Sequence, residues 1–324
     1  MGEFDLIARY FARPAKRSPL GPGDDCALLA PAPGMQLAVS SDMLVEGRHF
    51  LSTVDPARLG HKALAVNLSD LAACGAKPLA FTLALSLPTV DESWLAGFSQ
   101  GLFALADAHD CELVGGDTTR GPLNICITVF GEVPAGAALL RSGARAGEDI
   151  WVSGTLGDAR LALEAFRGTL SLPAALFAQA RARMESPTPR VTLGHALRGI
   201  ASAAVDVSDG LLGDLGHILR ASEIGARIDA DAAVTCIGVS TDPDFAAAAL
   251  PIEILRLCAL SGGDDYELVF TAPASAREAV AQAARSAATA VTRIGQTERD
   301  AGLRLVDAQG APITQRFDSF DHFA

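Results

Sequence analysis

The feature that most restricts what this chain can become is the segment at residues 66–78, which predicts the end of a helix carrying one acid on a small, apolar surface. Leu64, Leu68 and Leu71 recur at the spacing of a buried helical stripe, while Asp70 lies on another face. Because aspartate is rarely buried without a partner, Asp70 taken alone is more simply interpreted as a solvated helix-end residue. The aspartates elsewhere in the chain decide between that interpretation and a functional one.

Glycine and proline mark the limits of this helix. Pro56 suits its first turn, Gly75 suits its C-cap, and Pro78 prevents any continuation. The sequence therefore predicts a helix from about residue 56 that ends shortly before Gly75.

A similar Ser-Asp pair occurs in the second half of the chain. Val66-x-x-Ser69-Asp70-Leu71 is echoed by Val205-Asp206-x-Ser208-Asp209-Gly210-Leu211. Two halves built on related α/β units would place both pairs in comparable positions. A chance match between such short segments explains the echo equally well, so both interpretations stay open.

Length and charge limit the possible classes of protein. A chain of 324 residues with 49% hydrophobic residues is long enough for two domains, each with its own core. The 38 acidic residues outnumber the 26 basic ones, and the net charge of -12 argues against a nucleic-acid or anionic-membrane surface. An acidic protein that handles phosphates needs metal ions between itself and its substrate.

The cysteines and the N-terminus indicate a cytoplasmic protein. Six dispersed cysteines form no C-x-x-C pair, which favours reduced thiols over zinc or a disulfide framework. The first five residues include two acids where a signal peptide needs basic residues, and no apolar run reaches the ~18 residues of a membrane span. We therefore expect a soluble, cytoplasmic protein with no membrane partner.

The hydrophobic patterns predict two α/β domains, at residues 1–138 and 139–324. The boundary lies where glycine and arginine replace the apolar run at residues 135–147. In the first half, strands are expected at 26–29, 35–41, 79–87, 111–114 and 123–133, and helices at 3–11, from 56, and at 91–108. In the second half, strands are expected at 150–152, 203–207 and 266–271, and helices from 158, at 211–219 and from 275; residues 230–249 give too little pattern to assign.

Acidic residues gather in short segments that are expected at strand ends. These segments hold Asp24-Asp25, Asp42, Asp117, Asp206, Asp209 and Asp264-Asp265, with Asp70 on the helix between them. Each aspartate alone could be a solvated turn or N-cap residue. As a set in one cleft they would repel one another without cations, and hard oxygen ligands select Mg²⁺ or Ca²⁺. Several such ions imply a polyphosphate ligand.

Glycines next to these acids suggest a phosphate site. Gly115-Gly116, Gly154, Gly157, Gly210 and Gly262-Gly263 could let backbone N–H groups approach an anion. No Gly-x-x-x-x-Gly-Lys-Ser/Thr motif or dinucleotide glycine turn occurs, which excludes a P-loop or Rossmann nucleotide site.

Two further residues are candidates for contacts with a ligand. Arg141, at the predicted domain junction, could brace a phosphate, although an exposed linker arginine is an equal alternative. His49 follows Asp42 closely enough to face the same site, or it fills an ordinary structural role.

Together these motifs resemble the thiamine-monophosphate kinase family, of the superfamily that includes aminoimidazole-ribonucleotide synthetase and selenophosphate synthetase. The resemblance runs along essentially the whole chain. Its carriers are GDDCA at 23–27, SSDMLVEGRHF at 40–50, VNLSDLAACG at 66–75, GGDTT at 115–119, RSGA at 141–144, VSGTLGD at 152–158, DVSDGL at 206–211 and SGGDDYEL at 261–268.

The resemblance implies transfer of the γ-phosphoryl group of ATP to thiamine monophosphate, giving thiamine diphosphate and ADP. Carried over by position, the implied Mg²⁺ ligands are Asp25, Ser41, Asp42, Asp70, Asp117, Asp206 and Asp209. The implied ATP contacts are Gly116, Asp117, Arg141 and Ser208. The implied substrate contacts are His49, Asp264 and Phe320; many members carry glutamate where this chain has the shorter Asp264.

The resemblance also implies an N-terminal α/β domain that pairs in a homodimer and a C-terminal α/β domain that closes over the cleft. The chemistry suits such residues, because the attacking phosphate oxygen is largely ionised near neutrality and needs no strong base. Mg²⁺ ions would bring the two polyanions together, and direct in-line transfer is expected rather than a phospho-enzyme. Phe320 and Asp264 would suit the thiazolium cation.

Two alternatives remain at this level. One is another ATP-dependent synthetase of the same superfamily, against which the motif at 261–268 counts. The other is a non-catalytic, acidic protein that binds divalent metals, although the spacing of an EF-hand is absent.

Overall fold

The computed structural model describes residues 2–16, 18–20 and 26–320. The chain divides into two compact units. The first comprises Met1–Leu71 and Ala76–Gly136, and the second comprises Ala72–Gly75 and Ala137–Ala324. Each unit is described by itself.

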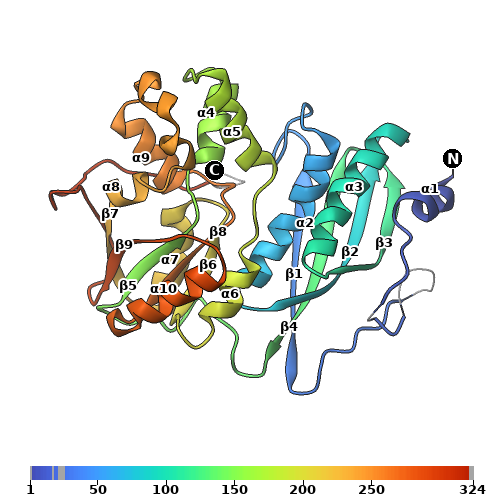
Figure 1. The fold of residues 1–324 in the computed structure, drawn as a ribbon, viewed down its shortest axis with the longest axis horizontal. Coiled ribbons are helices and arrows are strands. Elements are labelled where there is room, and N and C mark those ends of the chain that lie inside the picture. Colours follow the sequence, from blue (N-terminus) through green and yellow to red (C-terminus); the bar gives the residue numbers. More distant parts are fainter. Residues whose placement is uncertain (1, 17, 21–25, 321–324) are drawn as a thin grey trace. The chain divides into compact units, whose positions relative to one another are not determined.

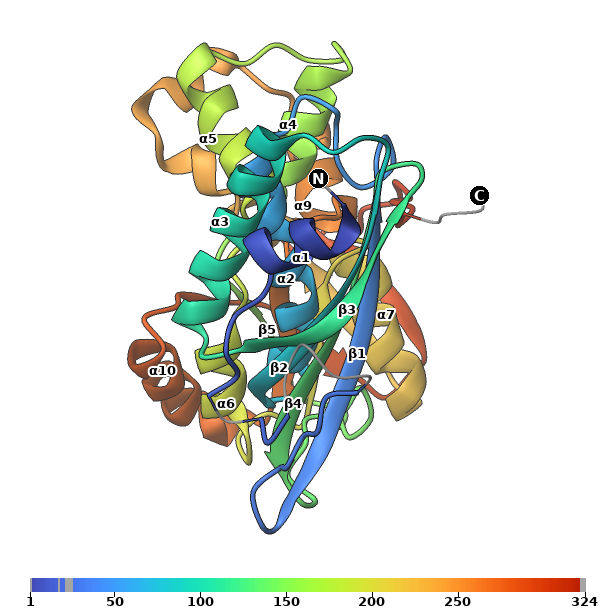
Figure 2. The ribbon, with the colours of Figure 1, turned by 90° about the vertical axis from the view of Figure 1, so that its right-hand side faces the viewer.

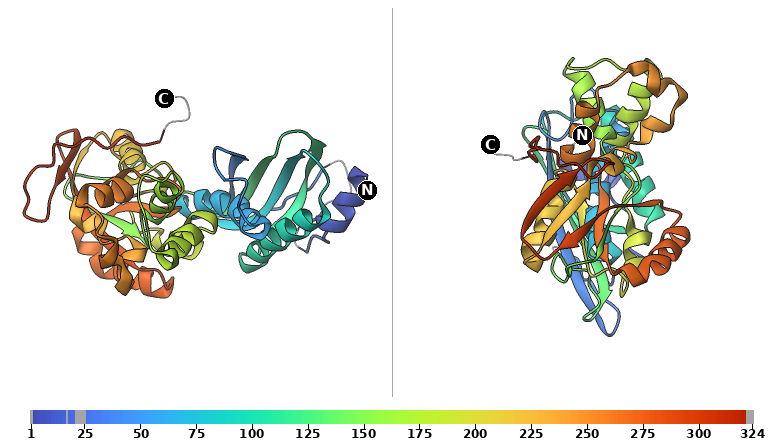
Figure 3. Two further views of the ribbon diagram at one scale, coloured as in Figure 1. Left: turned by 90° about the horizontal axis from the view of Figure 1, so that it is seen from above. Right: turned by 90° about the vertical axis from the view of Figure 1, so that its left-hand side faces the viewer.

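The first unit is a four-stranded sheet with helices on one face (Figures 1 and 2). Its elements are α1 (Glu3–Tyr10), β1 (Met35–Val45), α2 (Pro56–Ala73), β2 (Lys77–Leu87), α3 (Glu92–Ala108), β3 (Glu112–Arg120) and β4 (Asn124–Pro134). The strand order is β1-β4-β2-β3; β4 runs antiparallel to β1 and β2, and β2 runs parallel to β3. Seen from above, α2 and α3 lie along the same side of this sheet (Figure 3).

The helix predicted from about residue 56 to shortly before Gly75 forms as α2. Leu64 and Leu68 are fully buried and Leu71 is 1% exposed, so the apolar stripe of α2 faces the core. Gly75 has φ +68°, and the N–H of Ala76 donates to the carbonyl of Leu71, which closes the helix with the reversed turn that favours glycine.

Two glycines set how closely α2 approaches α3. A Cβ on Gly60 would lie 2.0 Å from the carbonyl oxygen of Phe98, and a Cβ on Gly101 would lie 1.8 Å from that of Ala57. Because no larger residue fits at either place, the backbones meet directly. The N-cap of α3 is Asp91, whose carboxylate accepts the N–H groups of Ser93 and Trp94.

Three strand predictions in this unit are wrong. Residues 26–29 form no strand, and in this segment Leu28 makes only an isolated bridge to Leu20. β1 continues to Val45 and β3 continues to Arg120, so Asp42 and Asp117 lie within strands and not at their ends. The strand predicted at residues 111–114 was expected to end before Gly115-Gly116, but Gly116 stays in the ladder opposite Leu83.

The second unit is built on a six-stranded sheet of order β10-β7-β9-β5-β8-β6, in which only β10 and β7 pair in parallel. Its strands are β5 (Asp149–Ser153), β6 (Ala203–Val207), β7 (Gly225–Asp229), β8 (Glu267–Ala272), β9 (Val291–Glu298) and β10 (Gly302–Val306). Its helices are α4 (Asp158–Phe166), α5 (Ala174–Glu185), α6 (Val191–Leu197), α7 (Leu211–Ser222), α8 (Ala230–Val234), α9 (Ile252–Ser261) and α10 (Arg277–Ser286), with short 3-10 turns η1 (Gly238–Thr241), η2 (Pro243–Ala248) and η3 (Ala274–Ala276).

The core of this unit lies between the sheet and its helices. Ile150 and Val152 of β5 and Val207 of β6 are fully buried, as is Leu211 at the start of α7. The two Ser-Asp pairs occupy different kinds of position: Ser69-Asp70 lies in the last turns of α2, whereas Ser208-Asp209 lies in the turn between β6 and α7. Of the two interpretations that the sequence left open, equivalent placement of the two pairs is therefore not what the structure shows.

Two properties of the chain concern its surroundings. In the ranges 2–16, 18–20 and 26–320, no helix combines the length and the apolar character needed to span a membrane. All six cysteines lie in these ranges, and no disulfide links any of them.

Candidate active site

Two of the predicted metal ligands meet where β1 packs on α2. The main-chain N–H of Asp42 donates to Oδ1 of Asn67 at 3.1 Å, and the Nδ2 of Asn67 donates to the carbonyl of Ala63 at 3.0 Å. The hydroxyl of Ser40 donates to Oδ2 of Asp70. Since Ser40 and Asp42 are alternate residues of one strand, both lie on the face that α2 covers. The structure therefore brings Asp42 and Asp70 to one interface.

Ser41 lies on the other face of β1. Its hydroxyl donates to the carbonyl of Ile127 at 3.1 Å and lies 3.0 Å from the hydroxyl of Thr128 on β4. The alternation of the strand thus directs the Ser41 side chain away from that of Asp42.

Asp117 and Gly116 lie on the opposite edge of the sheet from Asp42. Gly116 is opposite Leu83 and Asp117 is opposite Ala84, both on β2. Because β1 and β3 are three strand spacings apart in the order β1-β4-β2-β3, their main chains are separated by about 14 Å. A single sheet therefore does not bring Asp117 beside Asp42. Asp25, the remaining predicted ligand of this half, lies outside the described residues.

The imidazole of His49 has a defined orientation. The N–H of Val45 donates to its Nδ1 at 3.0 Å, and the ammonium of Lys62 donates to its carbonyl oxygen at 3.1 Å. Lys62 is only 2% exposed, so a buried charge fixes the backbone of this turn. With Nδ1 acting as an acceptor, the neutral ring carries its proton on Nε2 and can donate a hydrogen bond from there.

The predicted residues of the second unit converge on the turn between β6 and α7. Asp206 lies within β6 and is 5% exposed, and Ser208 and Asp209 follow the strand. The N–H of Asp264 donates to the carbonyl of Ser208 at 2.9 Å, and the N–H of Phe320 donates to that of Asp209 at 3.1 Å. Four residues predicted from three separate segments therefore share one location: Ser208, Asp209, Asp264 and Phe320.

The segment that carries Asp264 has a strained backbone. Asp264 and Tyr266 have φ values of +69° and +52°, a region that residues with a side chain seldom adopt. The N–H of Tyr266 donates to the carbonyl of Val207 at 2.8 Å, and its hydroxyl donates to Oδ1 of Asp264 at 3.1 Å. These bonds hold the Asp264 carboxylate in one orientation.

Arg141 lies in the loop before β5. Its carbonyl accepts a hydrogen bond from the hydroxyl of Ser222, the last residue of α7, and its side chain is exposed. Burial, with a contribution from the Arg141 charge, lowers the pKa of His217 on the same helix. The main chain of Arg141 therefore lies at the end of α7, the helix whose start carries the Ser208-Asp209 turn.

The glycine-rich loop at residues 153–157 does not offer its amides to a ligand, contrary to the sequence expectation. The N–H groups of Gly154 and Leu156 donate to the carbonyls of Ala290 and Cys236. The N–H of Thr155 donates to the carboxylate of Glu267 at 3.2 Å, and that of Gly157 donates to both oxygens of Asp265 at 3.0 and 2.9 Å.

Glu267 is the centre of a buried charged cluster behind this loop. Its side chain is fully buried and accepts two bonds from Arg190, at 2.6 and 2.5 Å, and one each from Arg183 and Ser153. A Cβ on Gly154 would lie 2.1 Å from this carboxylate, so only glycine allows the loop to pass so close.

One buried acid in this region, Asp214, was not predicted from the sequence, whereas Asp265, which is also buried, belongs to a predicted acidic segment. The carboxylate of Asp214 accepts the N–H groups of Ser208, Asp209 and Gly210. Burial raises the pKa of Asp214 to about 6, and it raises that of Asp265 well above the ordinary range. The signal that could have indicated Asp214 is the position of an acid in the first turn of a predicted helix, where free amides are near.

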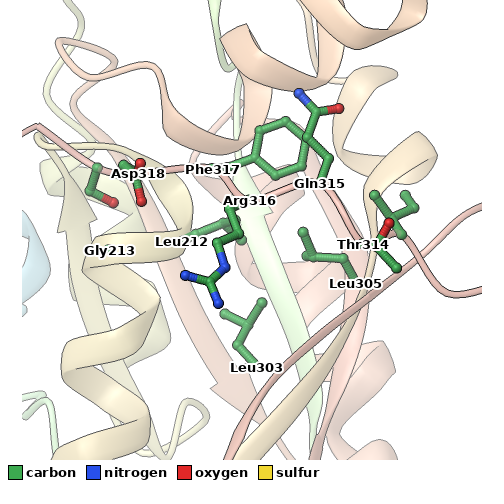
Figure 4. A pocket seen from close by; sticks show the side chains of 11 residues that line it. Leu212, Gly213, Leu303, Leu305, Thr314, Gln315, Arg316, Phe317 and Asp318 are labelled. Carbon is green, nitrogen blue, oxygen red and sulfur yellow. The ribbon is translucent and has the colours of Figure 1, made fainter.

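A pocket of about 440 Å³ lies beside the start of α7, between β10 and residues 313–319 (Figure 4). Leu212, Leu303 and Leu305 give it apolar walls, and Arg316 extends over them. A Cβ on Gly213 would lie 2.2 Å from Oγ of Ser319, so the C-terminal segment packs directly on α7. This packing places Phe320 beside the turn between β6 and α7 that contains Asp209.

The described ranges contain no group of three or more His, Cys, Asp or Glu side chains placed to hold a metal ion. In the first unit, acids lie at the β1–α2 interface and on β3, and in the second unit acids lie at the β6–α7 turn. Each group presents hard oxygen donors, the kind that Mg²⁺ prefers.

Comparison with known proteins supports a single family. Residues 23–133 match the model of the N-terminal domain of AIR synthase related proteins, and residues 145–308 match that of the C-terminal domain. The thiamine-monophosphate kinase of Salmonella typhimurium is 49% identical over 329 residues, covering 100% of this chain and 98% of the relative.

Solved structures agree with this result. The thiamine-monophosphate kinase of Stenotrophomonas maltophilia is 47% identical, with a TM-score of 0.82 over 93% of this chain and 94% of the relative. A structure described as AaThiL complexed with AMPPCP and TMP is 28% identical, with a TM-score of 0.74 over 91% of this chain and 89% of the relative. The α/β fold with two domains of this type, predicted from the sequence, is confirmed. Since its full length matches curated thiamine-monophosphate kinases at up to 49% identity, the chain belongs to the thiamine-monophosphate kinase family.

Proposed function

We propose that this protein is an ATP-dependent kinase that converts thiamine monophosphate and ATP to thiamine diphosphate and ADP. The observation that carries the proposal is 49% identity over the whole chain to a thiamine-monophosphate kinase. A more distant relative, at 28% identity, has been solved with AMPPCP and TMP bound. The activity uses ATP, and the cytoplasm is the proposed compartment.

Mg²⁺ is the proposed metal, held by Asp25, Ser41, Asp42, Asp70, Asp117, Asp206 and Asp209. Carboxylate and hydroxyl oxygens fit this ion, and Mg²⁺ commonly takes only one or two protein carboxylates and completes its shell with water and phosphate oxygens. Among residues 2–16, 18–20 and 26–320 no three acidic, histidine or cysteine side chains form a preformed cluster, which is compatible with ions that arrive with the nucleotide. When bound, the metal would neutralise charge between the two phosphate groups.

The protein's own residues bind and orient the two substrates. Gly116, Asp117, Arg141 and Ser208 are the proposed ATP contacts, and Arg141 suits a phosphate because guanidinium donors match its oxygens. His49, Asp264 and Phe320 are the proposed contacts for thiamine monophosphate. The Nε2–H of His49 can donate to the phosphate, and the carboxylate and ring can approach the thiazolium cation. The acceptor oxygen is already ionised, so direct in-line transfer needs no general base.

A homodimer through the N-terminal sheet is part of the proposal, with domain limits at 1–138 and 139–324. Leu37, Val39 and Met43 alternate along the open face of β1 and are 43%, 56% and 55% exposed. Asp42 and Asp117 lie on opposite edges of one sheet, too far apart to share an ion. A second copy packed on this face could bring β1 of one protomer toward β3 of its partner.

The activity is tested by ADP release from ATP and Mg²⁺, with thiamine monophosphate as acceptor and free thiamine as the control. We expect turnover only with the phosphorylated acceptor. Asp42→Asn and Asp70→Asn should each lower turnover at least ~100-fold while the circular dichroism spectrum is unchanged. No turnover dependent on thiamine monophosphate in the wild-type protein would refute the kinase.

The dimer is tested separately by mixing two inactive variants, Asp42→Asn and Asp117→Asn. If each site combines β1 of one protomer with β3 of its partner, random exchange restores about a quarter of wild-type activity, because half the dimers are mixed and each has one intact site. Sites built from one chain would give no restoration. Sedimentation of the wild-type protein as a monomer would exclude the dimer.

A further inference from the structure

The turn that joins β6 to α7 carries two proposed ligands, Ser208 and Asp209, and it is held by a buried residue outside the proposed ligand set. Asp214 lies in the first turn of α7 and is 4% exposed. A single oxygen of its carboxylate, Oδ2, accepts the N–H groups of Ser208, Asp209 and Gly210 at 3.0, 3.0 and 3.1 Å. Three consecutive amides therefore point toward one buried atom.

Every backbone polar group of this turn is bonded. The three N–H groups go to Asp214, and the carbonyl of Gly210 accepts from the N–H of Asp214 at 3.0 Å. The carbonyls of Ser208 and Asp209 accept from the N–H groups of Asp264 and Phe320. Asp214 thus makes four of the six bonds, and only side chains of the turn are left to meet a ligand.

Gly210 shows that the turn has little freedom to adopt another shape. Its φ is +120°, and a Cβ there would lie 2.9 Å from the carbonyl of Ser261. The segment is therefore pressed against α9 on one side while its amides face Asp214 on the other. A change at Asp214 would be transmitted to the direction of the Asp209 carboxylate, because the backbone between them is short and fully bonded.

We propose that Asp214 is a positioning residue that sets the orientation of Ser208 and Asp209 toward the metal and the nucleotide. This inference rests on the proposed function, since it takes these two residues as ligands. Asp214 is not itself a ligand in this assignment, because the residue is only 4% exposed and one of its two carboxylate oxygens is occupied by the three amides.

The test compares three variants with the wild-type protein. Asp214→Ala removes the acceptor, whereas Asp214→Asn keeps an amide oxygen that can take the place of Oδ2. The control is Asp229→Ala at the N-cap of α8, whose carboxylate also accepts backbone N–H groups, those of Asp231 and Ala232 at 3.0 and 2.9 Å. The control loses the same kind of bond away from the proposed site.

We expect Asp214→Ala to lower kcat/KM at least ~100-fold and to raise the Mg²⁺ concentration for half-maximal activity at least ~10-fold, because the ligand side chains are no longer aligned. Asp214→Asn should stay within ~5-fold of wild type in both quantities, and Asp229→Ala should leave the Mg²⁺ dependence unchanged. Wild-type Mg²⁺ dependence in Asp214→Ala would overturn the proposal, as would equal shifts in Asp229→Ala.

Hydrogen exchange gives a readout that does not depend on activity. The amides of residues 208–210 should be protected in wild type and in Asp214→Asn and should exchange at least ~10-fold faster in Asp214→Ala. If Asp214→Ala does not fold, Asp214→Ser, whose shorter hydroxyl can accept fewer of the three amides, replaces it with an intermediate shift expected. Unchanged protection in Asp214→Ala would refute positioning by Asp214 even if the wild-type protein is an active kinase. If the wild-type protein shows no kinase activity but Asp214→Ala loses protection, the proposed function is refuted while the role of Asp214 in holding the turn stands.

Discussion

The main-chain N–H of Val45 donates to Nδ1 of His49, so the two ends of one tight turn are joined through an imidazole whose proton lies on Nε2. The buried side chain of Lys62 also holds this turn, because its Nζ donates to the carbonyl oxygen of His49. His49 is therefore presented as a hydrogen-bond donor of fixed direction.

This orientation predicts different effects for two substitutions of His49. His49→Ala should raise the KM for thiamine monophosphate by about 10- to 100-fold, because a hydrogen bond to a charged group contributes ~1.5–3 kcal/mol. His49→Gln, whose amide can donate from nearly the same place, should lose less. Steady-state kinetics with varied acceptor measure this, and an unchanged KM in His49→Ala would remove His49 from the substrate contacts.

Two neighbouring glycines of β3 should respond differently to alanine. Gly116 has φ +146°, and its Cβ would lie 1.9 Å from the carbonyl of Leu83, whereas a Cβ on Gly115 would only touch Thr82 at 3.9 Å. Gly116→Ala should lower the free energy of unfolding by at least ~2 kcal/mol, while Gly115→Ala should stay within ~1 kcal/mol of wild type. Urea unfolding followed by circular dichroism provides the comparison, and equal losses would show that the close approach to Leu83 does not limit this position.

Glu267 should be the most sensitive acid of the second unit. Glu267→Gln leaves Arg183 and Arg190 without their shared buried carboxylate and should lower the free energy of unfolding by ~3–5 kcal/mol. The matched control is Glu278→Gln, because Glu278 also pairs with an arginine but is 85% exposed, and its loss should be below ~1 kcal/mol. A comparable effect in the control would contradict the role assigned to burial.

We expect Asp149 to contribute to the loss of folding stability at acidic pH. Its carboxylate is buried at the start of β5 and is bonded by Arg277 at 2.6 Å and by Arg293 at 3.2 Å. The hydrogen bond from Arg277 is the main cause that lowers the pKa of Asp149 below its ordinary value of 3.8. The folded state therefore holds fewer protons than the unfolded state in this range, so the stabilisation is present above about pH 4 and is lost as the pH falls below it.

Asp149→Asn removes this titration. The free energy of unfolding of the variant should be lower than that of wild type at pH 6, and the difference between the two proteins should shrink between pH 5 and pH 3. Denaturant unfolding at several pH values measures it, and a constant difference would show that the ion pair does not titrate in this range.

Local rules predicted the elements that have strong local signals. The stripe of Leu64, Leu68 and Leu71 and the cap at Gly75 defined α2, and the Ser208-Asp209-Gly210 sequence correctly indicated a strand-to-helix turn. The strand predicted at residues 111–114 was too short, because Gly116 continues it with a backbone that no other residue could adopt beside Leu83.

The features of the candidate site that could not be predicted from the sequence depend on long-range contacts. The position of Asp214 in the first turn of a predicted helix is shared with many exposed acids, and only the fold shows that its oxygen is buried and receives three amides. Likewise, Asp42 and Asp117 look equivalent in sequence, and only the strand order reveals that they lie on opposite edges of the sheet. The roles of the individual site residues remain predictions to be tested.

The hydrogen bonds made by the amides of the loop at 153–157 and of the turn at 208–210 affect the entropy cost of ligand binding. Because the amides of these segments are bonded by carboxylates and carbonyls of the protein itself, the chain gives up their conformational freedom when it folds and not when a substrate arrives. Nucleotide association at the second unit should therefore proceed without an ordering phase in these segments, as in a rigid receptor.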